Sequence, residues 1–218
     1  MDFITGATGI VGRELASQLI SSGRTVKALC RDNSDVASTE DFITSKGLSL
    51  DKLTWVKGEL NDPYSLDFAM EGCKRVFHAA ALISFHPSDE DSLFETNVEG
   101  TKNIVNSMVA KEVKTLVYVS SVAALGRQEN KIVEEETPFE DGVDVTRYSK
   151  SKYLAELEVW RGQEEGLSVT VVNPSVIIGA GDFSRSSAEL FPQIYSGLSF
   201  YPAGSGGYVS SSDVAKAC

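Results

Sequence analysis

The sequence predicts an α/β fold in which helices cover both faces of a parallel sheet. Two observations carry this prediction. Short apolar runs alternate with stretches of helical periodicity along most of the 218 residues, and a glycine-rich turn follows the first of these runs. Strands that are covered on both faces are apolar along their whole length, as these runs are. With 42% apolar residues, the chain can bury a sizeable core.

The glycine-rich turn has the sequence TGATGIVG at 5–12, between a short apolar run and a helical pattern. Its glycines are Gly6, Gly9 and Gly12, spaced G-x-x-G-x-x-G. A pyrophosphate must approach the backbone closely at the positive end of a helix, so such a turn needs positions without side chains. A chance glycine loop could have this spacing, but the context favours the strand–turn–helix unit of a dinucleotide-binding Rossmann fold.

Composition limits the expected partners and location. The formal net charge of −11 argues against a nucleic-acid partner, because nucleic-acid binding needs a basic face. No apolar run is long enough for a membrane span, and no secretory signal is visible. The cysteines Cys30, Cys73 and Cys218 are widely spaced, which favours a reducing, cytoplasmic location. With two histidines and no cysteine pair at metal spacing, no metal site is expected.

The remaining elements are expected in a regular order. Further strands are expected at 25–30, 53–57, 75–78, 115–119 and 168–172, and helices at 35–46, 64–70, 89–112 and 145–165. The dinucleotide-binding Rossmann domain is therefore expected to span 1–178. The stretch 179–218 is rich in Ser and Gly, and we expect it to begin a substrate-binding region that is truncated here.

The tip of the second expected strand, Cys30-Arg31-Asp32, bears on the choice of cofactor. An acid at this place holds the ribose hydroxyls of NAD, whereas an arginine accommodates the 2′-phosphate of NADP. Because Arg31 offers a fixed charge and a planar donor fork, NADP is favoured. Because of Asp32, NAD remains the alternative cofactor. Arg31 could also be an ordinary solvated cation of the loop.

Tyr148 and Lys152 are the candidate acid and its partner. They are four residues apart in an expected helix and so share one face. An ammonium beside a phenol favours phenolate, so we expect Lys152 to lower the pKa of Tyr148 towards neutrality. An ordinary exposed helix pair is the alternative interpretation.

Polar residues near the ends of other elements complete the candidate site. Ser120-Ser121 ends the fifth expected strand, where hydroxyls point into the ligand crevice. Asn97 and Gly100 lie inside an expected helix, which indicates either a kink that turns Asn97 towards the site or close packing at Gly100. His78 is expected to be a packed strand residue, and the chain should leave the sheet at 173–175, around a proline.

Seven motifs in this order resemble the extended short-chain dehydrogenase/reductase family. They are TGATGIVG at 5–12, GELND at 58–62, HAAA at 78–81, NVEGT at 97–101, YVSSVAALG at 118–126, YSKSK at 148–152 and NPSVIIG at 173–179. The resemblance implies a doubly wound Rossmann fold with a parallel sheet of about seven strands in the order 3-2-1-4-5-6-7. It also implies a homodimer, paired through the helices near 89–111 and 146–165, with Phe94, Val98, Val105, Leu157 and Trp160 as candidates for the seam. Burial of these five against the chain's own sheet is the alternative.

By this resemblance Tyr148 is the acid/base, Lys152 binds the nicotinamide ribose, Ser121 hydrogen-bonds the substrate oxygen and Asn97 supports them. The residues expected around the cofactor are, in all, Gly6, Thr8, Gly9, Ile10, Val11, Gly12, Arg31, Glu59, Leu60, Ala79, Ala80, Ala81, Tyr148, Lys152, Pro174, Ser175 and Val176. Ser84 and Asn173 are candidates for substrate contact.

Within the family, the chain looks most like the dihydroflavonol-reductase-like branch, whose members reduce a carbonyl with NADPH. The features that resemble this branch are the string SSVAALG, Arg31 and GAGD at 179–182. Sugar-nucleotide dehydratases of the family carry an Asp-Glu pair where this chain has Val122-Ala123, so the acid for elimination is missing. An NADP(H)-dependent oxidoreductase acting on a small molecule is therefore the favoured function. A nucleotide-sugar epimerase with transient hydride transfer and a non-catalytic NADP-binding redox sensor stay open.

Overall fold

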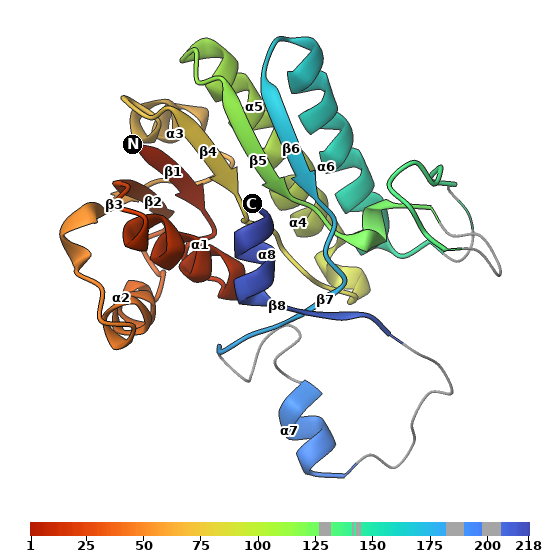
Figure 1. The fold of residues 1–218 in the computed structure, drawn as a ribbon. Helices are drawn as coiled ribbons and strands as arrows, with labels where there is room; N and C mark the ends of the chain where they lie inside the picture. Colours follow the sequence, from red (N-terminus) through yellow and green to blue (C-terminus); the bar gives the residue numbers. More distant parts are fainter. Residues whose placement is uncertain (127–131, 141, 143–144, 182–189, 198–205) are drawn as a thin grey trace.

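A computed structural model describes residues 1–126, 132–140, 142, 145–181, 190–197 and 206–218. Its main sheet has six parallel strands in the order β3-β2-β1-β4-β5-β6 (Figure 1). The strands are β1 (Asp2–Thr5), β2 (Val26–Cys30), β3 (Leu53–Lys57), β4 (Arg75–His78), β5 (Thr115–Val119) and β6 (Ser168–Val172). This order reverses between β1 and β4, the place where doubly wound sheets bind ligands. The predicted α/β Rossmann fold is thus confirmed.

Helices cover both faces of this sheet. They are α1 (Ile10–Ser21), α2 (Val36–Ser45), α3 (Pro63–Ala69), α4 (Glu90–Phe94), α5 (Gly100–Ala110), α6 (Arg147–Glu164) and α8 (Ser211–Ala217), with short 3₁₀ turns η1 (Leu50–Lys52), η2 (Pro87–Asp89) and η4 (Val122–Ala124). The helix α7 (Leu190–Tyr195) lies away from the sheet (Figure 1). Neighbouring residues of β1 belong to different apolar clusters: Phe3 packs with α3, α5 and α6, whereas Ile4 packs with α1, α2 and α8. Successive strand residues point to opposite faces, so both faces of β1 need apolar residues, and Phe3 and Ile4 supply them.

The seventh strand of the sheet is the main correction to the predicted fold. Residues Val176–Ile178 do form a strand, β7, but it pairs with β8 (Tyr208–Ser210) in a separate two-stranded sheet. Pro174 precedes β7, and a proline has no N–H to continue the ladder beside β6. The chain then returns to the main body, because α8 packs on α1 and Gln18 Nε2 donates to the Ser212 carbonyl at 3.0 Å.

The helix predicted over 89–112 is divided. A π-helical turn, η3 (Glu95–Glu99), separates α4 from α5 and contains Asn97. A Cβ on Gly100, the first residue of α5, would come within 2.9 Å of Leu60 Cβ. The packing alternative is thus confirmed at Gly100, which lies directly under Leu60. At Asn97 the helix contains a π-helical turn, but the buried Asn97 side chain does not turn towards the site as the kink alternative expected.

The candidate dimer seam is only partly available. Val105 is fully buried in the chain's own core, which removes it from the predicted seam. Phe94 and Val98 are half-buried, and Leu157 and Trp160 on α6 are 45% and 41% exposed.

Within the described residues, no helix has the length and apolar character needed to cross a membrane.

Candidate active site

The glycine turn between β1 and α1 is built around close backbone contacts. Gly6 has φ +70°, and a Cβ there would lie 2.6 Å from Ala80 N, just beyond β4. A Cβ on Gly12 would lie 2.1 Å from the Gly6 carbonyl oxygen. Gly9 N donates to that same oxygen at 2.9 Å. Only glycine satisfies the first two positions, so the turn holds α1 against the ends of β1 and β4.

The turn fits the phosphates of a dinucleotide. Gly9 is the N-cap of α1, and among the described residues no side chain caps the first turn of the helix. The N–H groups of that turn are therefore available to an anion at the positive end of the helix. Thr8 and Gly9 are exposed, while the Val11 side chain lies in the core, so Val11 could offer only its backbone.

The tip of β2 carries the residues predicted to select the cofactor. Cys30 is buried, and Arg31 is exposed, with its backbone N–H donating to Ser34 Oγ at 2.9 Å. The carboxylate of Asp32 accepts from Lys57 at 2.5 Å, and this contact lowers the pKa of Asp32. Asp32, on which the NAD alternative depends, is thus already engaged, although both partners are exposed to solvent.

The other expected cofactor residues lie beyond the carboxyl ends of β3, β4 and β6. Glu59 is exposed, and Leu60 is half-buried against α5. Ala79 and Ala80 follow β4 directly, and their backbone passes over Gly6, whereas Ala81 is exposed. After β6, Pro174 is buried, Ser175 is half-buried and Val176 is exposed; the Pro174 carbonyl accepts from Val122 N at 3.0 Å.

Ser121 and Tyr148 come together across β5 and α6. Ser121 follows β5 by two residues, and Tyr148 lies in the first turn of α6, where Thr146 is the N-cap. The Ser121 hydroxyl hydrogen-bonds the Tyr148 phenol and lowers its pKa, but burial is the larger effect and raises that pKa. The phenol therefore holds its proton at neutral pH. The rings of Tyr148 and Phe85 form an edge-to-face pair, with centroids 5.8 Å apart.

Lys152 is buried behind this pair. It is 1% exposed, and its ammonium donates to the Tyr118 phenol at 2.9 Å and to the Val119 carbonyl at 3.0 Å. Burial lowers the pKa of Lys152 to about 7, opposed by the charge of Glu156. The structure thus differs from the expectation that Lys152 lowers the pKa of Tyr148: the ammonium is bound to Tyr118, and desolvation controls both groups.

Glu156 was not predicted, although it lies four residues after Lys152 on the same face of α6. Its carboxylate accepts from Ser120 Oγ at 2.6 Å and from Asn173 Nδ2 at 2.9 Å. Ser120 is buried in this contact, which supports the choice of Ser121 as the serine that faces the site. Asn173, a candidate for substrate contact, instead ties the end of β6 to α6 and to the Ser121 carbonyl.

Asn97 holds the loop after β4 in place. Its side chain accepts from Leu82 N at 2.7 Å and donates to the Leu82 carbonyl at 2.9 Å and to Ser151 Oγ at 3.0 Å. With three bonds and 1% exposure, Asn97 supports the site without facing it. Ser84, further along that loop, donates to Asp89 Oδ2 at 2.7 Å.

A buried polar network joins the glycine turn to Lys152. The Thr101 hydroxyl donates to the Asn97 carbonyl at 2.6 Å, so His78 Nε2, 3.0 Å away, is the donor to Thr101. His78 Nδ1 then accepts from the Thr5 hydroxyl at 2.6 Å. Burial lowers the pKa of His78 to about 3, which keeps it neutral. The prediction that His78 is a packed strand residue is confirmed.

Tyr118 is the member of this network that sequence reasoning missed. Its phenol bonds both Thr101 and Lys152. The available signal was a tyrosine among the buried aliphatic residues Leu116, Val117 and Val119 of β5, since a buried phenol needs a polar partner.

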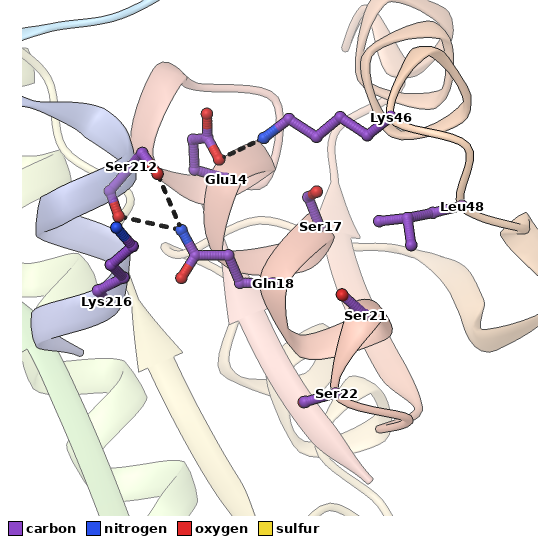
Figure 2. A pocket seen from close by; sticks show the side chains of 9 residues that line it. All are labelled: Glu14, Ser17, Gln18, Ser21, Ser22, Lys46, Leu48, Ser212 and Lys216. Carbon is purple, nitrogen blue, oxygen red and sulfur yellow. Dashed lines mark hydrogen bonds and ion pairs between the residues drawn. The ribbon is translucent and has the colours of Figure 1, made fainter.

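A groove in the described part of the chain lies elsewhere. It has a volume of about 460 Å³ and is formed by α1, α8 and the segment just after α2, and no predicted site residue lines it (Figure 2). We place the candidate active site at the carboxyl ends of β1, β4 and β5, where the glycine turn, Ser121 and Tyr148 lie.

Comparisons with known proteins agree with this geometry. Residues 3–218 match the model of the NAD dependent epimerase/dehydratase family. The chain belongs to that family. This confirms the resemblance to extended short-chain dehydrogenases/reductases, and it confirms NAD-type dinucleotide binding as the family's property.

Relatives of this chain include named reductases. It is 36% identical to the putative dihydroflavonol 4-reductase of Synechocystis sp. over 183 residues, which are 83% of this chain and 50% of that protein. It is 35% identical to sterol demethylase protein B of Methylococcus capsulatus over 186 residues, 84% of this chain and 53% of that protein. The solved structure of gox2253 matches 99% of this chain and 64% of that one, with 32% identity and a TM-score of 0.87. The chain thus spans about half the length of these two curated relatives.

Proposed function

We propose that this chain contains the cofactor site and the acid of an NADP(H)-dependent oxidoreductase that reduces the carbonyl of a small molecule, or oxidises the corresponding alcohol. The main support is the hydrogen bond between Ser121 and Tyr148, which lies beside the buried Lys152. This pair lies at the same end of the sheet as the glycine turn. The reductase names of several relatives, such as dihydroflavonol 4-reductase, support the same class of reaction.

The cofactor supplies the hydride for the carbonyl carbon. Tyr148 gives its phenol proton to the carbonyl oxygen, and Ser121 hydrogen-bonds that oxygen while negative charge develops on it. Because burial raises the pKa of Tyr148 and keeps the phenol protonated at neutral pH, its proton is available for the reduction. Lys152 would bind the nicotinamide ribose. Its hydrogen bonds to the Tyr118 phenol and to the Val119 carbonyl hold its ammonium in a fixed position.

NADP is the proposed cofactor, with NAD the alternative. Arg31 is exposed at the tip of β2 and follows a neutral, buried Cys30, so its charge is available to a 2′-phosphate. The neighbouring acid, Asp32, has Lys57 as its partner and is less suited to take the ribose hydroxyls.

A nucleotide-sugar epimerase is the second candidate, favoured by the name of the family that the chain matches. The two functions differ in their cofactor balance. We would incubate the full-length protein with NADPH and a panel of ketones and aldehydes, and separately with sugar nucleotides and oxidised cofactor, and follow NADPH absorbance and product. A reductase consumes one NADPH for each carbonyl reduced. Conversion of a sugar nucleotide without net change in the cofactor would overturn the proposal.

A further inference from the structure

The buried hydrogen bonds around Tyr118 have a fixed direction. The Thr101 hydroxyl gives its only proton to the Asn97 carbonyl at 2.6 Å, so its oxygen can only accept from other partners. The Tyr118 phenol also bonds that hydroxyl and must therefore be the donor. The Tyr118 oxygen is then left to accept, and it lies 2.9 Å from the Lys152 ammonium. The bonds thus lead from Lys152 through Tyr118 and Thr101 to the Asn97 carbonyl.

Burial gives this arrangement its importance for Lys152. Tyr118, Thr101 and Lys152 are each 1% exposed. A buried ammonium keeps its charge only where acceptors replace the water that it has lost. Its two acceptors in the described part of the chain are the Tyr118 phenol and the Val119 carbonyl. Of these, the phenol is the acceptor that a side-chain substitution can remove.

The titratable groups around Lys152 and its phenol partner come from three elements. They are Tyr118 on β5, His78 on β4, and Tyr148 and Glu156 on α6. Burial raises the pKa of both tyrosines and lowers the pKa of His78 to about 3, so these three groups are neutral at pH 7. Glu156 is the charged member of the set and raises the pKa of Lys152 through its charge. Tyr118, in contrast, bonds the ammonium directly and fixes its position.

We infer that Tyr118 is a positioning residue for Lys152: its phenol, oriented by Thr101, holds the ammonium in place beside Tyr148. This rests on the proposed function, in which Lys152 binds the nicotinamide ribose. Within the described residues, the Tyr118 phenol and the Val119 carbonyl engage two of the three N–H groups of the ammonium, which leaves the third for the ribose. Without the phenol oxygen, the ammonium loses one of these two fixed bonds and is harder to keep charged.

Tyr118→Phe tests this, because it removes the acceptor and keeps the ring, whose centroid lies 4.5 Å from the Lys152 ammonium. NMR titration of protein labelled with ¹³C at the lysine ε-carbons follows Lys152 without a substrate, and the signal missing from Lys152→Met assigns it. An acceptor favours the charged form, so in Tyr118→Phe the midpoint of the Lys152 titration should move at least about one pH unit towards lower pH, the scale of a hydrogen bond to a charged group.

The reaction should show the same movement. A charged Lys152 is lost as pH rises through its pKa, so kcat/KM for NADPH, which reports the free enzyme, should decline at a lower pH in Tyr118→Phe than in the wild type. Tyr153→Phe is the matched control. Tyr153 is the next residue on α6, but its ring stacks on Phe139, with centroids 4.1 Å apart. This variant should leave the Lys152 midpoint and the pH profile unchanged.

The other outcomes separate this inference from the proposed function. An unchanged Lys152 midpoint in Tyr118→Phe overturns the inference, and so does an equal movement in Tyr153→Phe. A loss of turnover that is the same at every pH, without a moved profile, shows a merely structural role for Tyr118 and also overturns it. If the wild-type protein reduces no carbonyl with NADPH while the midpoint moves as expected, the proposed function fails and the placement of Lys152 by Tyr118 is upheld.

Discussion

Burial sets the chemistry of single residues in this site. Tyr148 holds its proton because desolvation of the phenolate outweighs the hydrogen bond from Ser121. Lys152 has a pKa lowered to about 7 for the converse reason, because burial penalises an ammonium. Neither property could be assigned from the four-residue spacing of Tyr148 and Lys152, since spacing says nothing of the solvent around the pair.

His78 gives a prediction on acid stability. Its pKa falls to about 3 in the folded protein, from an ordinary value of about 6.5, so the unfolded chain binds one more proton between these pH values. The stability that depends on neutral His78 is complete above about pH 6.5 and is lost as pH falls towards 3. Urea unfolding should show this loss with a slope of up to about 1.4 kcal/mol per pH unit from this group.

Replacing His78 separates its titration from that of the carboxylates. His78→Gln should lower stability at pH 7 and flatten its dependence on pH between about 4 and 6. The exposed His86, replaced in the same way, serves as the control and should leave the slope unchanged. Equal slopes for wild type and His78→Gln would contradict the assignment of His78 as a buried neutral residue.

At the scale of elements, the glycine turn is a packing device as well as a binding site. A side chain at Gly12 would press into the Gly6 carbonyl at 2.1 Å, whereas at Gly9 the nearest atom would be 3.2 Å away. Gly12→Ala should therefore destabilise the protein by about 3 kcal/mol and abolish dinucleotide binding. Gly9→Ala, in the same turn, should cost less than about 1 kcal/mol. Thermal or urea unfolding of the two variants measures this, and similar stability for both would argue against the packing described here.

Much at this scale could be predicted, and the exceptions have physical causes. The order of strands and helices followed from apolar periodicity, and Ser121 just after β5 and Tyr148 within α6 lie where the sequence analysis expects them. The separate β7–β8 pair was missed, because β8 depends on a partner some 30 residues away in sequence. The bonds from Lys152 to Tyr118 and from Glu156 to Ser120 and Asn173 were also missed, since they join side chains from different elements.

Across the described part of the molecule, two apolar clusters fill the two sides of the sheet, while several helices keep large apolar side chains exposed. Leu157 and Trp160 lie three residues apart on α6 and are exposed, and Val98 is half-buried in η3, which contacts α6. Exposed large apolar side chains that are close together mark association sites. We expect the full-length protein to form a homodimer through this face, as the family resemblance implies, and Leu157→Glu to dissociate it. Light scattering at micromolar protein would detect this, and a monomeric mass for the wild type would count against the dimer.

The central claim is that Tyr148 donates the proton in an NADPH-dependent reduction. Turnover of NADPH by the full-length protein and by Tyr148→Phe, with cofactor binding measured in parallel, tests it most directly. We predict that Tyr148→Phe loses at least about a hundredfold in turnover while its NADP affinity stays near that of the wild type, because only the hydroxyl is removed. Ser121→Ala should lose about 10- to 100-fold, since one hydrogen bond to the substrate oxygen is lost while the acid remains. Wild-type turnover in Tyr148→Phe on any carbonyl that the protein reduces would contradict the account.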